Sequence, residues 1–192
     1  MPRKLLLLIP LLLPLPVLAQ TSPTLLDLQL IAIEARANVA SHSPESIAEF
    51  AEAERAAQTG DVEAQLALAI TWLKAAANEQ HFVPAYNALG EHLMRAAVDE
   101  LDRGEAFHWY DRSAREKQPP GMRNLARAHE LGLGVKQSDQ LALIWYERAG
   151  WRGDVPAIRR MLDVYAKGEL GQAANAEDAA EWRGKLMEAE NK

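Results

Sequence analysis

A repeat of about 36 residues is the feature that most constrains how this chain folds. Prolines recur at intervals of 36 residues, at Pro84, Pro120 and Pro156. Tryptophans, each preceded by alanine three positions earlier, recur after 36 and 37 residues, at Trp109, Trp145 and Trp182. A sequence period of this length is typical of stacked supersecondary units, because one unit cannot bury its apolar face alone. We therefore expect an array of similar units.

The sequence pattern of each unit predicts two helices joined by a turn. Proline suits the first turn of a helix, where its missing N–H has no partner to lose. A small residue follows each proline, and the expected core face of the first helix occupies positions zero, four and eight counted from it: Ala85, Leu89 and Leu93, then Gly121, Leu125 and His129, then Ala157, Met161 and Tyr165. The second helix carries the Ala-x-x-Trp element, and its expected N-caps are Asp102, Ser138 or Asp139, and Asn175. No long stretch alternates apolar and polar residues as a strand would, so the predicted class is all-α.

One unit carries a pattern with many characteristic positions. It comprises Gly-Met-Arg-Asn-Leu-Ala from Gly121, a Gly-Leu-Gly-Val turn from Gly132, Ala-Leu-Ile-Trp-Tyr-Glu-Arg-Ala from Ala142, and Gly153-Asp154. This pattern resembles a complete Sel1-like repeat, a relative of the tetratricopeptide repeat. The resemblance implies a right-handed α-solenoid of stacked antiparallel helix pairs.

The predicted organisation follows the repeat frame. It comprises a signal peptide (1–19), an N-terminal segment with a capping helix (20–45), a degenerate or truncated Sel1-like repeat (46–83), and three further Sel1-like repeats (84–119, 120–155 and 156–192), of which 120–155 matches best. Only 21 residues separate Ala64 from Ala85, so we expect one helix of a shortened repeat there. The turn glycines are missing after Leu93, which predicts that the first helix of residues 84–119 continues past Ala97.

The N-terminal residues have the pattern of a secretory signal peptide. Arg3 and Lys4 precede an apolar run from Leu5 to Leu18, and small residues at Val17 and Ala19 suit cleavage before Gln20. A retained membrane anchor is the weaker interpretation, because this run is short for a spanning helix and contains three prolines. We expect a periplasmic or secreted protein that does not insert into a membrane after cleavage.

Composition excludes several functions. The chain has no cysteine, so disulfides, thiolate metal sites and a cysteine nucleophile are excluded. Its net charge of −6 argues against nucleic acid, whose phosphates require a surplus of Lys and Arg. The five histidines fit no metal template, and no serine lies in a nucleophile elbow. We therefore predict no cofactor, no metal and no catalytic residue. His129 occupies a core position and is interpreted as a hydrogen-bonded, partly buried ring.

The candidate binding residues come from the first helix of each repeat. In Sel1-like repeats this helix builds most of the concave face, at positions two and six after the small residue. The resemblance therefore implies six partner-binding residues: Asn87, Glu91, Arg123, Arg127, Arg159 and Asp163. Two interpretations stay open. Either these are solvated helix faces with intrahelical partners such as Glu130 for Arg127, or the three arginines form a groove for an acidic segment of another protein.

The leading functional hypothesis is a non-catalytic, exported scaffold or adaptor that binds another protein on the concave face. One alternative, by family analogy, is an immunity or regulatory protein that inhibits an exported enzyme or sensor. A second is a cell-wall glycan-binding or hydrolytic protein, although the relatives with that association rely on paired cysteines, which this chain lacks. The sequence leaves the oligomeric state open.

Overall fold

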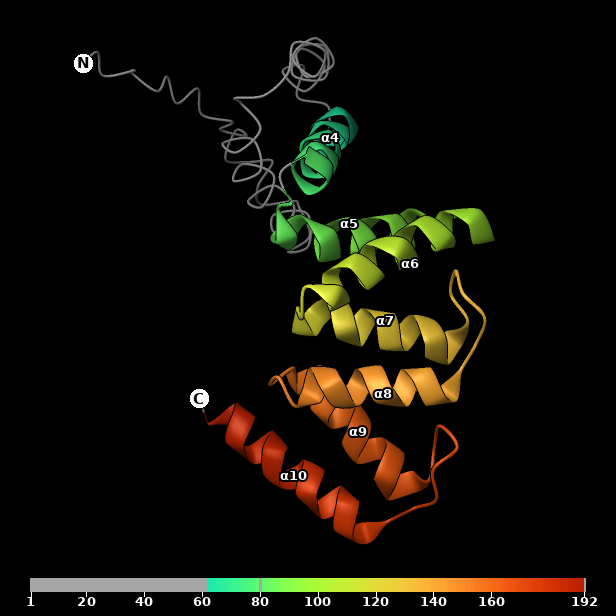
Figure 1. The fold of residues 1–192 in the computed structure, drawn as a ribbon, viewed down its shortest axis with the longest axis vertical. Helices are drawn as coiled ribbons and strands as arrows, with labels where there is room; N and C mark the ends of the chain where they lie inside the picture. The colour runs from blue at the N-terminus through green and yellow to red at the C-terminus, as the bar shows by residue number, and fades with distance from the viewer. Residues whose placement is uncertain (1–61, 80, 192) are drawn as a thin grey trace, which may run out of the picture. The chain divides into compact units, whose positions relative to one another are not determined.

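The computed structural model describes residues 62–79 and 81–191, which form α-helices and no strand (Figure 1). The chain divides into two compact units, Met1–Leu73 and Lys74–Lys192, with the boundary inside helix α4 (Val62–Glu79). The predicted signal peptide and N-terminal capping helix lie outside the described residues. None of the described helices is long and apolar enough to span a membrane.

The second unit contains three helix pairs in chain order. They are α5 (Val83–Ala96) with α6 (Glu100–Arg115), α7 (Pro119–Leu131) with α8 (Asp139–Gly150), and α9 (Val155–Lys167) with α10 (Ala176–Glu190). The two helices of each pair pack together, and successive pairs pack through α6 on α7 and α8 on α9. Short connections alternate between two edges of this stack (Figure 1). The predicted all-α solenoid of consecutive helix pairs is confirmed.

Prolines and side-chain caps set where these helices begin. Each first helix has proline in its opening turn, as predicted. Ser138 caps α8 by accepting from the Leu141 amide, and Asn175 caps α10, so both predicted N-caps are confirmed. The prediction of Asp102 as the cap of α6 is wrong, because Asp99 holds that position and accepts from the backbone N–H of Asp102 at 3.0 Å.

Helix α5 ends earlier than the missing glycines suggest. Its last residue is Ala96, and Ala97 is extended, so the predicted continuation past Ala97 is wrong. The side chain of Asp102 accepts from the Val98 amide at 2.9 Å, while Asp99 accepts from the Asp102 amide. The two bonds satisfy the amide of Asp102, one of the donors that the first turn of a helix leaves unpaired, and the amide of Val98 just before the cap. A capping pair therefore replaces the glycine turn.

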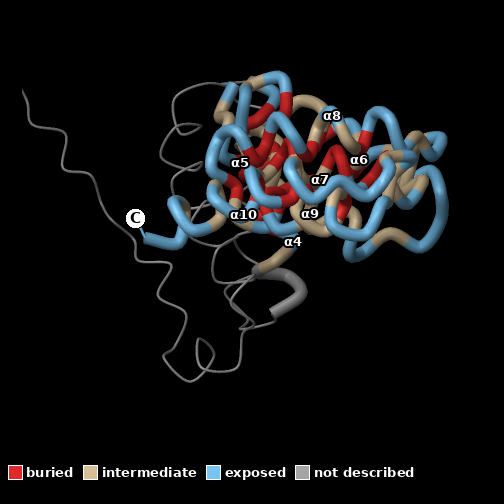
Figure 2. The backbone as a smooth tube through the Cα atoms, turned by 90° about the horizontal axis from the view of Figure 1, so that it is seen from below, coloured by how far each residue is buried: buried red, intermediate tan, exposed pale blue. Residues whose placement is uncertain are grey.

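The predicted core positions form the interior of the second unit. Ala85, Leu89, Leu125, Ala157 and Met161 are buried at positions zero and four of the first helices. At position eight only His129 is buried, while Leu93 and Tyr165 are half-buried, so the prediction holds in part there. Figure 2 shows the buried segments inside the stack, with exposed backbone around them. Trp109 and Trp182 are buried, while Trp145 is half-buried and packs against the same cluster. The aromatic repeat is therefore mainly a packing feature.

The loop between α7 and α8 contacts the preceding repeat. Gly132 and Gly134 both have positive φ, which glycine adopts without strain. The Gly134 amide donates to Glu100 Oε1 at 2.7 Å. A Cβ at Gly134 would lie 2.2 Å from the carbonyl oxygen of Arg103, so the loop lies directly against α6. The close approach and the backbone conformation both require glycine here.

Candidate functional site

An open cleft of about 750 Å³ lies within the second unit. Helices α5 to α9 and the loop after α7 contribute its lining: Glu91, Met94, Arg95, Arg103, Tyr110, Arg123, Asn124, Arg127, Leu133, Tyr146, Pro156 and Arg160. Five of these residues are arginines and only one is acidic. The cleft is therefore cationic in a chain whose net charge is −6.

Three of the five arginines have acidic partners. Arg103 pairs with Glu100 at 3.2 Å, one turn away on the same helix. Arg123 pairs with Asp154 at 3.0 Å. Arg160 is held between Glu130 and Glu169, and hydrogen bonds to both raise the pKa of a guanidinium that burial alone would lower. These three side chains are fixed in position by the protein itself.

Arg95 and Arg127 differ from the other three. Within residues 62–79 and 81–191, neither guanidinium forms an ion pair or a hydrogen bond with another side chain. Arg127 lies in an exposed position on α7, and Arg95 in an exposed position on α5. Each can present its planar fork of donors to an external carboxylate, a geometry that lysine lacks.

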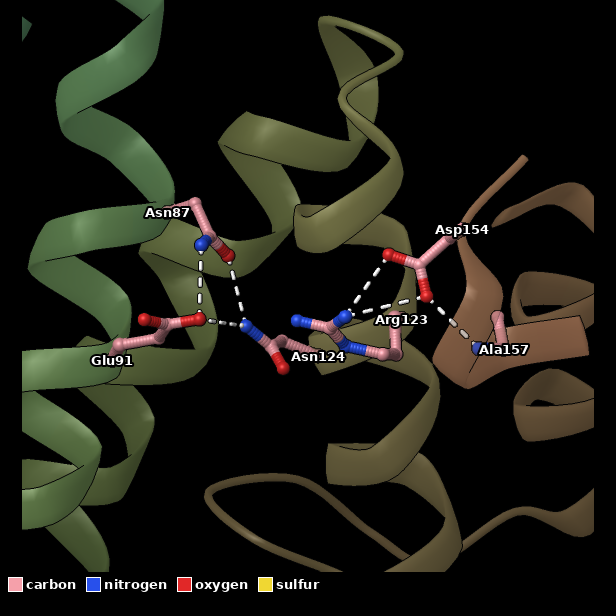
Figure 3. Close-up of polar contacts among 6 residues, drawn as sticks. All are labelled: Asn87, Glu91, Arg123, Asn124, Asp154 and Ala157. Carbon is pink, nitrogen blue, oxygen red and sulfur yellow. Dashed lines mark hydrogen bonds and ion pairs between the residues drawn. The ribbon is translucent and has the colours of Figure 1, made fainter. Parts of the chain in front are cut away.

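A polar cluster of Asn87, Glu91 and Asn124 joins α5 to α7 (Figure 3). Glu91 Oε1 accepts from Nδ2 of Asn87 and from Nδ2 of Asn124, both at 3.0 Å. Asn124 Nδ2 also donates to Asn87 Oδ1 at 2.9 Å. Three side chains from two repeats thus form a closed hydrogen-bonded network on one wall of the cleft.

A second polar link joins α7 to α9 (Figure 3). Asp154 is buried and caps α9, with its Oδ1 accepting from the Ala157 amide at 2.9 Å. Arg123 Nη1 donates to both carboxylate oxygens, at 3.0 and 3.3 Å. The buried carboxylate is therefore satisfied by a charge partner and a backbone donor together.

Two tyrosines line the cleft and differ in how their hydroxyls are used. Tyr146 donates to Glu130 Oε2 at 2.7 Å, and burial together with this carboxylate raises its pKa. Tyr110 is only 5% exposed, and its hydroxyl makes no hydrogen bond within the described part of the chain. Burial and Glu91 raise the pKa of Tyr110 more than the neighbouring arginines lower it, so the hydroxyl stays protonated. It is a free donor at the cleft.

Within the described residues, no three His, Asp or Glu side chains are grouped as metal ligands. His129 is buried, and its Nδ1 has no hydrogen-bond partner there, so the prediction of a fully hydrogen-bonded ring is wrong for that atom. The ring contacts Phe107 edge-on at 5.4 Å between centroids, which indicates packing.

Sequence comparison assigns the repeats. The Sel1 repeat family matches residues 51–81, 83–117 and 119–154, which is more than half of the chain. The chain belongs to the Sel1 repeat family. In residues 62–154, these matches correspond to helix α4 and to the pairs α5–α6 and α7–α8. Modules of this family generally mediate protein–protein interaction, and their fold is typically a non-catalytic scaffold.

Relatives of known structure share the Sel1 repeat fold. A Sel1 repeat protein from Oxalobacter formigenes is 26% identical with a TM-score of 0.58, over 75% of this chain and 58% of that one. A protective antigen of uropathogenic Escherichia coli that displays the same fold is 27% identical with a TM-score of 0.57, over 72% and 33%. The protein NMB1327 of Neisseria meningitidis serogroup B is 32% identical over 64% of this chain and 25% of its own length. The chain thus spans a quarter of that relative.

Three of the six predicted residues line the cleft, and a fourth is hydrogen-bonded to its lining. Glu91, Arg123 and Arg127 line it, and Asn87 binds the lining residues Glu91 and Asn124. The intrahelical partner considered for Arg127 is engaged elsewhere, since Glu130 binds Arg160 and Tyr146.

The other two predicted residues lie away from the cleft. Arg159 pairs with Glu190 of α10 at 2.5 Å and Asp163 with Lys167 at 2.9 Å, all largely exposed. In α5 and α7, position two contacts the next first helix or its cap: Asn87 accepts from Asn124 of α7, and Arg123 pairs with Asp154, the N-cap of α9. In the described residues no further first helix follows α9, so Arg159 turns to α10 instead.

Sequence reasoning missed several lining residues. Asn124 and Arg160 occupy position three of their repeats, and Arg95 occupies position ten. Positions three, six and ten are separated by three and four residues, so they form one helical stripe beside the predicted one. That spacing was the available signal. Arg103 and Tyr110 come from α6, which the concave-face expectation did not consider.

Proposed function

We propose that this protein is an exported, non-catalytic interaction module that binds an acidic segment of a partner protein in the arginine-lined cleft. The observation that carries the proposal is the state of Arg95 and Arg127, two guanidiniums at one cleft without carboxylate partners among the described residues. Membership of the Sel1 repeat family supports the class of function. The leader-like residues 1–19 support export.

The cleft chemistry favours a carboxylate ligand with apolar neighbours. Arg95 and Arg127 provide charge-assisted donors, and the hydroxyl of Tyr110, which lines the same cleft, adds a neutral donor. Met94, Leu133 and Pro156 line the same cleft and can contact apolar side chains. An extended peptide that alternates acidic and apolar residues would satisfy both kinds of lining.

The binding test uses a defined peptide and a matched control. The probe is an acetylated, amidated six-residue peptide of alternating Asp and Leu, measured by isothermal titration against the mature protein. We expect the double variant Arg95→Gln, Arg127→Gln to lose at least about ten-fold in affinity, a loss of the size measured for interface hot spots. Arg159→Gln, which removes the same charge outside the cleft, should bind as the wild type does.

Two further results would contradict the binding proposal. An Asn–Leu peptide that binds as well as the Asp–Leu peptide would exclude recognition of the carboxylate. Affinity that does not change between about 0.1 M and about 1 M salt would exclude an electrostatic contact, because the screening length falls from about 10 to about 3 Å over that range.

Export is tested separately. Protein recovered from the exported fraction should begin at Gln20 by N-terminal sequencing, because cleavage after Ala19 fits the small-residue pattern. Recovery of the whole population inside the cell with Met1 retained would contradict export and leave the binding proposal intact.

A further inference from the structure

Glu91 and Arg95 lie four residues apart on α5, with the acidic residue on the N-terminal side. This spacing and order are the most favourable for an ion pair on a helix. Yet the two side chains form no ion pair in the structure, and Arg95 is left without a carboxylate among the described residues. The absence requires a cause, since the partner is within reach along the helix.

The side-chain amides of Asn87 and Asn124 hold Glu91 instead. Asn87 donates to Glu91 Oε1 from one turn before it on α5, and Asn124 donates to the same oxygen from α7. Both bonds are 3.0 Å long and part-buried, and Asn124 is itself fixed by Asn87 Oδ1. Hydrogen bonds to an ionised acceptor are among the stronger polar contacts in proteins. Together they compete with a solvent-exposed helical ion pair, which contributes little.

We propose that Glu91 is an internal competitor for the ligand carboxylate at Arg95, and that Asn87 and Asn124 restrain it so that the cleft stays open to an acidic peptide. This inference rests on the proposed function. Asn87 and Asn124 are positioning residues here: their effect on the ligand passes through Glu91. When an amide is removed, Glu91 turns toward Arg95 and takes the place of the ligand's carboxylate.

The restraint makes the cleft selective for acidic side chains. Four charged side chains lie near enough to Tyr110 to affect its pKa: the guanidiniums of Arg95, Arg123 and Arg127, and the carboxylate of Glu91, which the amides hold in place. A ligand carboxylate that enters there meets two unpaired guanidiniums and an unused hydroxyl donor. A neutral or basic segment gains none of these contacts and faces a cationic cleft.

A double-mutant cycle tests the proposal with the Asp–Leu peptide as the probe. We expect Asn124→Ala to weaken binding about five-fold, a coupling of the size found between residues in one hydrogen-bond network. Glu91→Gln should restore affinity in that background. Glu91→Gln also removes a negative charge, so it can raise the affinity for the peptide in any background. The decisive quantity is therefore the coupling: the affinity gained from Glu91→Gln must be larger in Asn124→Ala than in the wild type.

Two controls keep the result interpretable. Circular dichroism should show the same helical content in every variant, and Asn87→Ala, which leaves α7 unchanged, should weaken binding in the same direction. A crystal structure of Asn124→Ala should show a Glu91–Arg95 ion pair. Equal gains from Glu91→Gln in both backgrounds, or a Glu91 that does not approach Arg95, would overturn the restraint.

The outcomes separate this inference from the proposed function. If the wild type binds the Asp–Leu peptide but the cycle shows no coupling, the restraint is wrong and the binding proposal stands. If the wild type does not bind the peptide, both the acidic-segment proposal and the competition fail.

Discussion

Arg123 and Asp154 join two successive repeats through a charge that also begins a helix. The guanidinium on α7 lies 3.0 Å from the carboxylate, which at the same time caps α9 through the Ala157 amide. One side chain therefore serves both the local start of a helix and the contact between helices. Removal of the Asp154 carboxylate should therefore lower the free energy of unfolding by more than the loss of either the cap or the ion pair alone.

We expect Asp154→Ala to lower the free energy of unfolding by about 2–4 kcal/mol, from a lost cap and an unpaired, partly buried guanidinium. Urea denaturation measures this directly. Asp163→Ala is the control, since its solvent-exposed pair with Lys167 should contribute little to stability. Equal losses in the two variants would contradict the double role of Asp154.

Removal of the hydroxyl should lower stability at Tyr146 and leave it nearly unchanged at Tyr110. Tyr146→Phe loses a hydrogen bond to the Glu130 carboxylate and should cost about 1.5–3 kcal/mol of unfolding free energy. Tyr110→Phe loses no hydrogen bond to a described residue and should change stability by less than about 0.5 kcal/mol. Urea denaturation of the two single variants measures both changes, and the variants are a matched pair because each loses only one hydroxyl. A larger loss for Tyr110→Phe would show that its hydroxyl already has a partner.

Gly121 marks where α7 packs closest to the preceding helix. A Cβ there would lie 2.2 Å from Ser113 Oγ and 3.0 Å from the Ser113 backbone carbon, so the helices must move apart. Gly121→Ala should therefore destabilise by about 1–3 kcal/mol, the usual cost of overpacking. Gly184→Ala in α10, where a Cβ meets open space, should instead stabilise by up to about 1 kcal/mol. Thermal melts compare the pair, and a stabilised Gly121→Ala would refute the close packing.

Burial of His129 makes stability depend on pH. Desolvation lowers its pKa in the folded state, outweighing the contributions of the Lys136 backbone and Asp111, which raise it. Below the unfolded pKa of about 6.5 the unfolded chain binds a proton that the folded chain resists. Stability should therefore fall as pH decreases through about 6.5, and His129→Tyr should reduce that slope. Urea midpoints at several pH values between about 5 and 8 measure it, and an unchanged slope would exclude His129 as the cause.

The core of the second unit could be predicted from spacing alone. Positions zero and four, counted from the small residue after each proline, are buried, as the helical period requires. The end of α5 could not be predicted in this way, because the side chains of Asp99 and Asp102, which accept from the amides of Asp102 and Val98, replace a glycine turn. Several acidic residues in that stretch fit a cap equally well. Such ambiguity is resolved by hydrogen-bond geometry that no residue pattern contains.

The candidate site was only partly predictable for a related reason. Arg123 and Arg127 follow from their helix position, but whether an arginine is paired depends on which acid the next repeat brings to it. Arg159 finds Glu190, 31 residues later, while Arg127 finds no acid within the described residues. Tyr110 was indistinguishable from a core aromatic, because nothing in its spacing shows that its hydroxyl reaches the cleft.

The hydrogen bond from the Gly134 amide to Glu100 has a consequence for how the array unfolds. In a solenoid each repeat contacts only its neighbours, and the interfaces between neighbours couple their stability. Here the loop of one repeat is anchored on the first turn of α6 in the repeat before it. Fraying of either repeat therefore releases a polar contact of the other, so residues 83–154 should melt as one cooperative block in hydrogen exchange.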